Sequence, residues 1–146
     1  MFQSVHASHN QRLYFPRLGS ITDIANLVCE HRMDTITSTD RQIVFWFTVH
    51  HPTRIVNRPA VEMLIATTEF SARDVPLIRG NVVITGSSGD GGPANLTDDQ
   101  VRSLANLETR GKAVWTLERR FARDLRESRR RLRARSAALQ SAWRLA

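Results

Sequence analysis

The sequence predicts an α+β fold, with a small sheet covered by short helices and a long, amphipathic, arginine-rich C-terminal helix. Three observations support this prediction. Residues 43–49 and 77–85 are rich in β-branched residues, as strands are. Short segments around them carry apolar residues at helical spacing, and from residue 97 the helical pattern is almost continuous. The 146 residues suffice for one domain with its own core.

The N-terminal residues give the weakest pattern. Residues 1–19 have no period and contain proline and glycine, which predicts an irregular arm before a small α+β domain at residues 20–96. Ser20 is expected to cap a short amphipathic helix with apolar residues at helical spacing. The polar stretch "MDTITSTDRQ" at residues 33–42 predicts a turn. Met33 would also serve as an alternative start, and the sequence leaves this open.

The centre of the domain contains the predicted sheet. The stretch "IVFWFTV" (residues 43–49) predicts a strand that is buried on both faces, with a short partner strand at 54–57. Pro59 suits the first turn of a second short helix because its fixed φ matches helical geometry. The strand at 77–85 is expected to bend at Gly80.

A glycine-rich loop, "GSSGDGGPAN" (residues 86–95), lies between this strand and a helix start, as in many phosphate-binding sites. A Walker-type loop needs Lys followed by Ser or Thr after its glycines, but here Pro93 and Ala94 follow. Two aspartates in the first turn of the next helix, which Thr97 caps, would repel a phosphate. We therefore expect a turn and no nucleotide cofactor.

The C-terminal helix is predicted over residues 97–146, with a possible break near Gly111. Its apolar residues recur at spacings of three and four in an eleven-residue repeat, which favours a slight right-handed supercoil. They are Val114, Leu117, Phe121, Leu125, Leu132, Leu139 and Trp143, with Ser128 and Ser136 completing the stripe. The first 109 residues can shield only part of so long an apolar stripe from water. The stripe therefore predicts a homo-oligomer or a helical protein partner.

The charge is concentrated in the same helix. Residues 1–109 hold nine arginines against eleven acidic residues, a net charge of −2, whereas residues 110–146 hold twelve basic residues against three acidic ones, a net charge of +9. At 100° per residue, five arginines face away from the apolar stripe: Arg119, Arg123, Arg126, Arg130 and Arg133.

This arginine row has three interpretations. It is a phosphate-binding track for nucleic acid, a contact for an acidic protein partner, or a solvated face braced by Glu127 and Asp124 with neighbouring arginines. The large excess of basic residues favours nucleic acid bound through its backbone. The alternative is a non-enzymatic structural or regulatory protein that assembles with itself or with an acidic partner.

No residue pattern indicates catalysis or a metal site. Cys29 and His31 do not share a helix face, and the adjacent His50 and His51 would point to opposite faces of an extended chain. No nucleophile motif is present, and two glutamates of the second helix have the spacing of a solvated face. We expect no metal, no cofactor and no enzymatic activity, although an enzyme assembled from distant residues by the fold stays open.

The sequence also indicates the cellular compartment. The single cysteine is typical of a reducing compartment, and the N-terminus lacks the pattern of a secretory signal. No apolar run approaches the roughly 20 residues that span a bilayer. These features predict a cytoplasmic protein without a membrane partner.

Residues 55–104 carry a resemblance. They contain an "NRPA" helix start, the strand "IRGNVVITG", the glycine- and aspartate-rich turn and the helix start "LTDDQV". In these motifs the sequence resembles a family of small uncharacterised proteins from actinobacteria and their phages. The resemblance implies an accessory protein of a bacterium or phage with a high-GC genome, and brings no catalytic or ligand residues with it.

Overall fold

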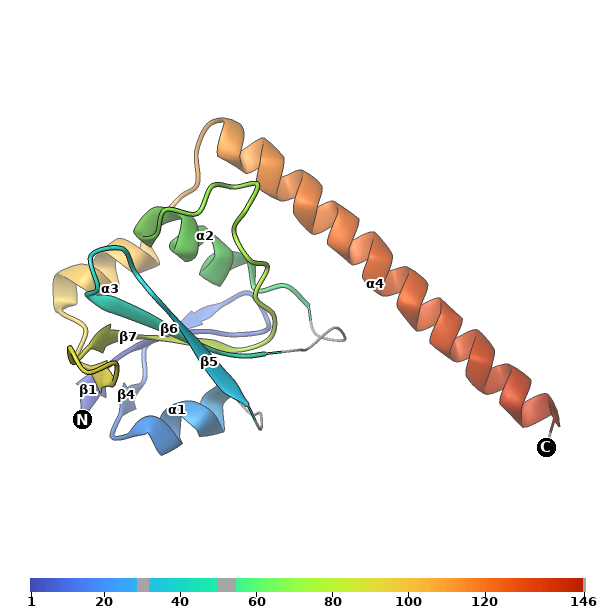
Figure 1. The fold of residues 1–146 in the computed structure, drawn as a ribbon, viewed down its shortest axis with the longest axis horizontal. Helices are drawn as coiled ribbons and strands as arrows, with labels where there is room; N and C mark the ends of the chain where they lie inside the picture. The colour runs from blue at the N-terminus through green and yellow to red at the C-terminus, as the bar shows by residue number, and fades with distance from the viewer. Residues whose placement is uncertain (29–31, 50–54, 146) are drawn as a thin grey trace.

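The structure is a computed structural model that describes residues 1–28, 32–49 and 55–145. The predicted α+β fold is confirmed (Figure 1). Within the described residues, the main sheet has the order β3-β2-β7-β6-β5, with β8 paired to β7, and a small second sheet pairs β1 with β4. All of these pairs are antiparallel.

The elements have the following bounds. The strands are β1 (Phe2–Gln3), β2 (Val5–Ala7), β3 (Leu13–Tyr14), β4 (Arg17–Leu18), β5 (Met33–Thr37), β6 (Ile43–Thr48), β7 (Val82–Ser87) and β8 (Pro93–Ala94). The helices are α1 (Ile21–Val28), α2 (Arg58–Thr67), α3 (Asp98–Ala105) and α4 (Lys112–Leu145).

The main sheet separates two apolar cores. Successive residues of a strand face opposite sides, so Phe45 of β6 joins the larger core with α2, while Trp46 joins the smaller core with α1. Figure 1 shows these two helices on opposite sides of the sheet. The prediction that this strand is buried on both faces is confirmed, because Ile43, Val44, Phe45 and Trp46 are all buried.

The N-terminal residues differ from the prediction. Instead of an irregular arm, they form four short strands, and β2 pairs with the central strand β7. Val5 and Ala7 are fully buried in the larger core, while His6 between them points to the other face of the sheet. Strands of two or three residues are too short to show a period in the sequence, which explains the error.

Two further strand predictions need correction. Residues 33–37 of the expected turn form β5, an edge strand paired with β6 along its whole length. Its threonines suit a strand whose outer face meets water. The strand expected at 77–85 begins only at Val82; before it, Arg79 makes an isolated bridge with Val56, and Gly80 bends the chain with a φ of 72°. Residue 54 of the partner strand expected at 54–57 lies outside the described residues.

The glycine-rich loop turns the chain from β7 into β8, as expected. Gly89 and Gly91 have φ values of 83° and 89°, in the left-handed region that favours glycine. The following helix has the predicted capping box: the Thr97 hydroxyl accepts from the Gln100 backbone N–H, and the Gln100 side chain accepts from the Thr97 backbone N–H.

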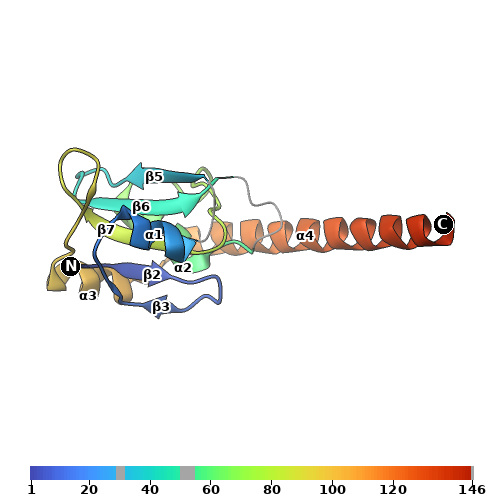
Figure 2. The same cartoon turned by 90° about the horizontal axis from the view of Figure 1, so that it is seen from below.

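The C-terminal region is two helices and not one. Helix α3 ends at Ala105, and α4 begins at Lys112, directly after Gly111 with a φ of 70°. The expected break near this glycine is therefore a six-residue linker, 106–111. Figures 1 and 2 show that α4 runs past the domain and projects from it, so that its C-terminal end lies far from the sheet. Among the described residues, no helix has the length and apolarity that a membrane crossing requires.

Candidate nucleic-acid interface

The first part of α4 is held by the apolar core of its own chain. Leu117 is 1% exposed and Phe121 is 4% exposed, and both belong to the larger core with residues of α2 and α3. Because these two residues lie one helical turn apart, they fix the direction of the helix against the domain.

Polar contacts strengthen this attachment on the flank of the same helix face. Arg79 donates to both carboxylate oxygens of Asp124, and this ion pair is largely shielded from water. The Arg120 guanidinium donates to the carbonyl oxygens of Ala72 and Val75, at 2.9 and 2.8 Å. The solvated-face interpretation included a contact of Arg120 with Asp124; that contact is not formed, because each of the two side chains contacts the domain instead.

A third contact joins α4 to the start of α2. The Arg58 guanidinium lies 4.9 Å from the ring centroid of Phe121, a cation–π geometry, and 3.6 Å from the carboxylate of Glu118. Burial and the nearby carboxylate of Glu118 raise the pKa of Glu62 above its ordinary value, while Arg58 opposes this shift. The helix is thus anchored over about two turns, from Leu117 to Asp124.

Beyond Asp124 the helix leaves the domain, and we call residues 125–145 the projecting segment. Four residues of the predicted apolar stripe lie exposed on it: Leu125 is 40% exposed, Leu132 59%, Leu139 58% and Trp143 81%. Leu117 and Phe121 are used within the chain, and Val114 is half-buried. Of the seven predicted interface residues, only these four are therefore available to a partner.

The five predicted arginines, Arg119, Arg123, Arg126, Arg130 and Arg133, are all exposed, and we call them the arginine face. Within the described residues, none of them forms an ion pair. Of the three carboxylates on α4, those of Glu118 and Asp124 pair with Arg58 and Arg79 of the domain, and Glu127 pairs with Arg131 at 3.6 Å. The acidic residues of the helix thus leave the arginine face uncompensated.

The sequence analysis did not identify one exposed aromatic residue that lies beside the arginine face. Trp115 is 72% exposed and lies on the arginine side of α4, about 20° from the direction of Arg126 at 100° per residue. The same helical projection that placed the arginines would have placed it, since it does not fit the apolar stripe. It gives the arginine face an aromatic surface at its N-terminal end.

The charge along the projecting segment is also divided. Residues 126–135 hold six arginines and one glutamate, whereas residues 136–143 hold no charged side chain. Several arginines lie three or four positions apart, for example Arg126 and Arg130, where like charges destabilise a helix. A bound anion at this face would relieve that repulsion.

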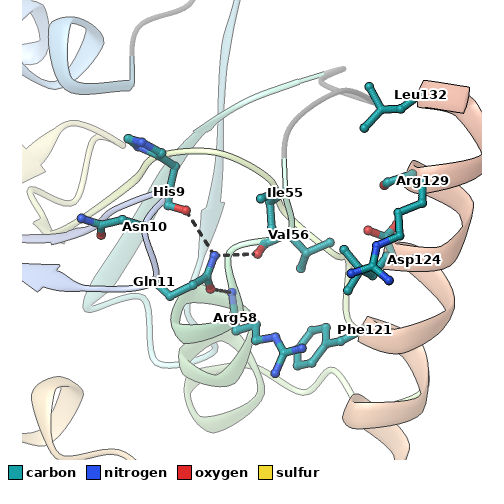
Figure 3. Close-up of a pocket in the computed structure, with 12 residues that line it drawn as sticks. His9, Asn10, Gln11, Ile55, Val56, Arg58, Phe121, Asp124, Arg129 and Leu132 are labelled. Atoms are coloured by element: carbon teal, nitrogen blue, oxygen red, sulfur yellow. Dashed lines mark hydrogen bonds between the residues drawn. The ribbon is translucent and has the colours of Figure 1, made fainter. Parts of the chain in front are cut away.

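A groove lies where the projecting segment leaves the domain, and we call it the elbow groove (Figure 3). Its volume is about 540 Å³. Its apolar lining comes from Ile55 on the domain side and from Phe121, Leu125 and Leu132 on the helix side. Gln11 holds the domain side in place, because its side chain bridges the Val56 carbonyl and the Arg58 backbone N–H.

Two further observations concern metal ligands and known proteins. Among the described residues, no group of three or more His, Cys, Asp or Glu side chains is placed to hold a metal ion, while Cys29, His31, His50 and His51 lie outside those residues. Comparison with family models, curated proteins and solved structures finds no match to this chain. The candidate interface therefore consists of residues of α4.

Proposed function

We propose that this protein binds nucleic acid through phosphate contacts made by the arginine face of α4. The observation that carries this proposal is the set of five exposed arginines without carboxylate partners among the described residues. From Arg119 to Arg133 the helix extends about 21 Å, which corresponds to roughly six base-pair steps of duplex DNA. The role is binding and not catalysis.

The chemistry of the side chains defines the kind of recognition. Arginine forms bidentate contacts with phosphate oxygens, and these contacts position a protein without reading the sequence. Trp115 lies beside the arginines and offers a stacking surface to an unpaired base at the end of the row. We therefore propose broad affinity for nucleic acids with little sequence preference. In view of the resemblance of residues 55–104, the setting we propose is a small phage or prophage accessory protein.

The test is the salt dependence of DNA binding. If five phosphates are engaged, the slope of log affinity against log salt concentration is about −4.5 for duplex DNA. Replacing all five arginines of the face by Gln should remove most of this slope and weaken binding to every sequence alike.

A matched control separates the arginine face from overall charge. The exposed arginines Arg12, Arg17, Arg41, Arg73 and Arg102 of the domain are replaced by Gln instead, so that both variants lose five positive charges from the formal net charge of +7. The control should keep most of the affinity and the slope. Equal losses in both variants would show that net charge, and not the arginine face, determines binding.

The alternative function is a structural or regulatory protein whose arginines contact an acidic protein surface. The exposed apolar residues of the projecting segment favour a protein contact of some kind. This alternative predicts no duplex-DNA binding at moderate salt, together with an acidic partner that is retained by the protein and lost with the five Gln substitutions.

A further inference from the structure

We propose that the projecting segment pairs in antiparallel orientation with the same segment of a second copy, and that Trp143 of each copy enters the elbow groove of the other. This pairing goes beyond nucleic-acid binding and does not depend on it. The exposed stripe from Leu125 to Trp143 is about 27 Å long, and the domain of its own chain does not cover it.

The distribution of charge favours a second copy in this orientation. An antiparallel pair centred near residue 134 places the basic residues 126–133 of one copy beside residues 135–142 of the other, of which only Arg135 is charged. A parallel pair in register would place each arginine next to its equivalent, and the repulsion would be largest where the charge is densest. An antiparallel pair therefore spreads the charge over the whole segment.

Side-chain size supports the same register. With the centre near residue 134, Leu132 faces Ser136 of the second copy, and Leu139 lies next to its Ser128. At these two positions a large residue meets a small one, as interdigitating helices require. The two serines interrupt the stripe of a single helix, and in the pair they leave room for the leucines of the partner.

The elbow groove offers a binding site for Trp143, the last residue of the stripe. In this register Trp143 of one copy lies level with Leu125 of the other, where the helix borders the groove. The groove offers Ile55, which is 64% exposed, together with the exposed leucines of the helix. An exposed tryptophan gains most from such a site because aromatic side chains bury a large apolar area at interfaces.

The dimensions set the strength of the pair. The stripe is roughly 27 Å long and a helix about 10 Å wide, so the contact is well below the roughly 800 Å² per partner of a standard stable complex. We therefore expect a reversible dimer that dissociates on dilution and not an obligate one.

Cysteine cross-linking tests the orientation. In a Cys29→Ser background, Ser128→Cys and Ser136→Cys are each treated with a short bis-maleimide. In the antiparallel pair, the two Ser136 positions lie about 6 Å apart along the axis, and the two Ser128 positions about 18 Å apart. Any parallel register gives equal separations for both. Cross-linking at 136 but not at 128 is expected; equal cross-linking at both, or none at either, would overturn the proposal.

Sedimentation of two tryptophan variants tests the groove. Trp143→Ala should weaken dimerisation about tenfold or more, as the loss of an aromatic side chain that fills a pocket at an interface does. Trp115→Ala is the matched control, since this residue is similarly exposed but lies away from the stripe. Equal effects of the two variants, or a wild-type monomer at every concentration, would refute the pairing. The five-Gln variant of the arginine face should still dimerise, whatever its affinity for DNA.

Discussion

Replacing Phe121 by alanine should detach α4 from the domain and lower the stability of the whole fold. The ring is 4% exposed and lies in the larger core, so truncation removes its burial and leaves a cavity. Substitutions of this kind cost about 3–5 kcal/mol. The lost contact with the Arg58 guanidinium adds at most about 1 kcal/mol, because that side chain is half exposed.

This loss is large compared with the total stability. Domains of this size unfold with about 5–15 kcal/mol, so a loss of about 3–5 kcal/mol would remove roughly a fifth or more of the stability of a typical domain. Leu132→Ala is the matched control on the same helix, since that residue is 59% exposed and lies outside the domain core. At a dilution where the protein is monomeric, the control should change the unfolding free energy by less than about 0.5 kcal/mol.

Urea unfolding followed by tryptophan fluorescence measures the difference. Trp46 is 5% exposed in the core between the sheet and α1, so its emission reports exposure of the core on unfolding. Trp115 and Trp143 are already exposed and contribute a nearly constant background. Unfolding of Phe121→Ala at the same urea concentration as Leu132→Ala would show that the burial of Phe121 does not hold the helix on the domain.

Two further predictions concern the domain. Asn57 is fully buried and caps α2, and its side-chain amide donates to two backbone carbonyls; Asn57→Ala should cost roughly 2–4 kcal/mol in urea unfolding, and a loss below 1 would contradict this role. Glu62 has a raised pKa, so its favourable contribution is present below its ordinary pKa of 4.5 and is lost as the pH rises through the raised value. Glu62→Gln should flatten stability against pH in that range, and an unchanged profile would refute it.

Local patterns in the sequence were sufficient to predict the central strand and the ends of the C-terminal helices. The strand at 43–49 was predicted from its β-branched and aromatic residues, and the structure has it from Ile43 to Thr48. The capping box at Thr97 and the break near Gly111 also followed from residues close in sequence. Predictions of this kind succeed because the physical cause lies within one turn or one strand.

The elements that depend on distant residues were not predicted. β2 has only three residues, and its pairing with β7 joins positions almost eighty residues apart. The attachment of α4 likewise depends on Arg79 and on the carbonyls that Arg120 contacts, which a helical projection does not contain. The projection placed Leu117 and Phe121 correctly on the apolar side. It did not distinguish the part of the stripe that the domain buries from the part that stays exposed.

The structure divides α4 into surfaces that need not compete. The domain takes the apolar side as far as Asp124, and beyond it the same side is open for a second copy. The arginine face, which extends from Arg119 to Arg133, points away from this stripe, so the two proposed contacts use different sides of one helix. An antiparallel pair would carry two arginine faces on its outer sides, and a polyanion that neutralises them would lower the repulsion that opposes pairing. By linkage, pairing would then raise the affinity for the polyanion by the same factor. Nucleic-acid binding and pairing use separate residues. A mutation can therefore remove one of them and leave the other in place, and the remaining one then loses only the strengthening that came from the coupling.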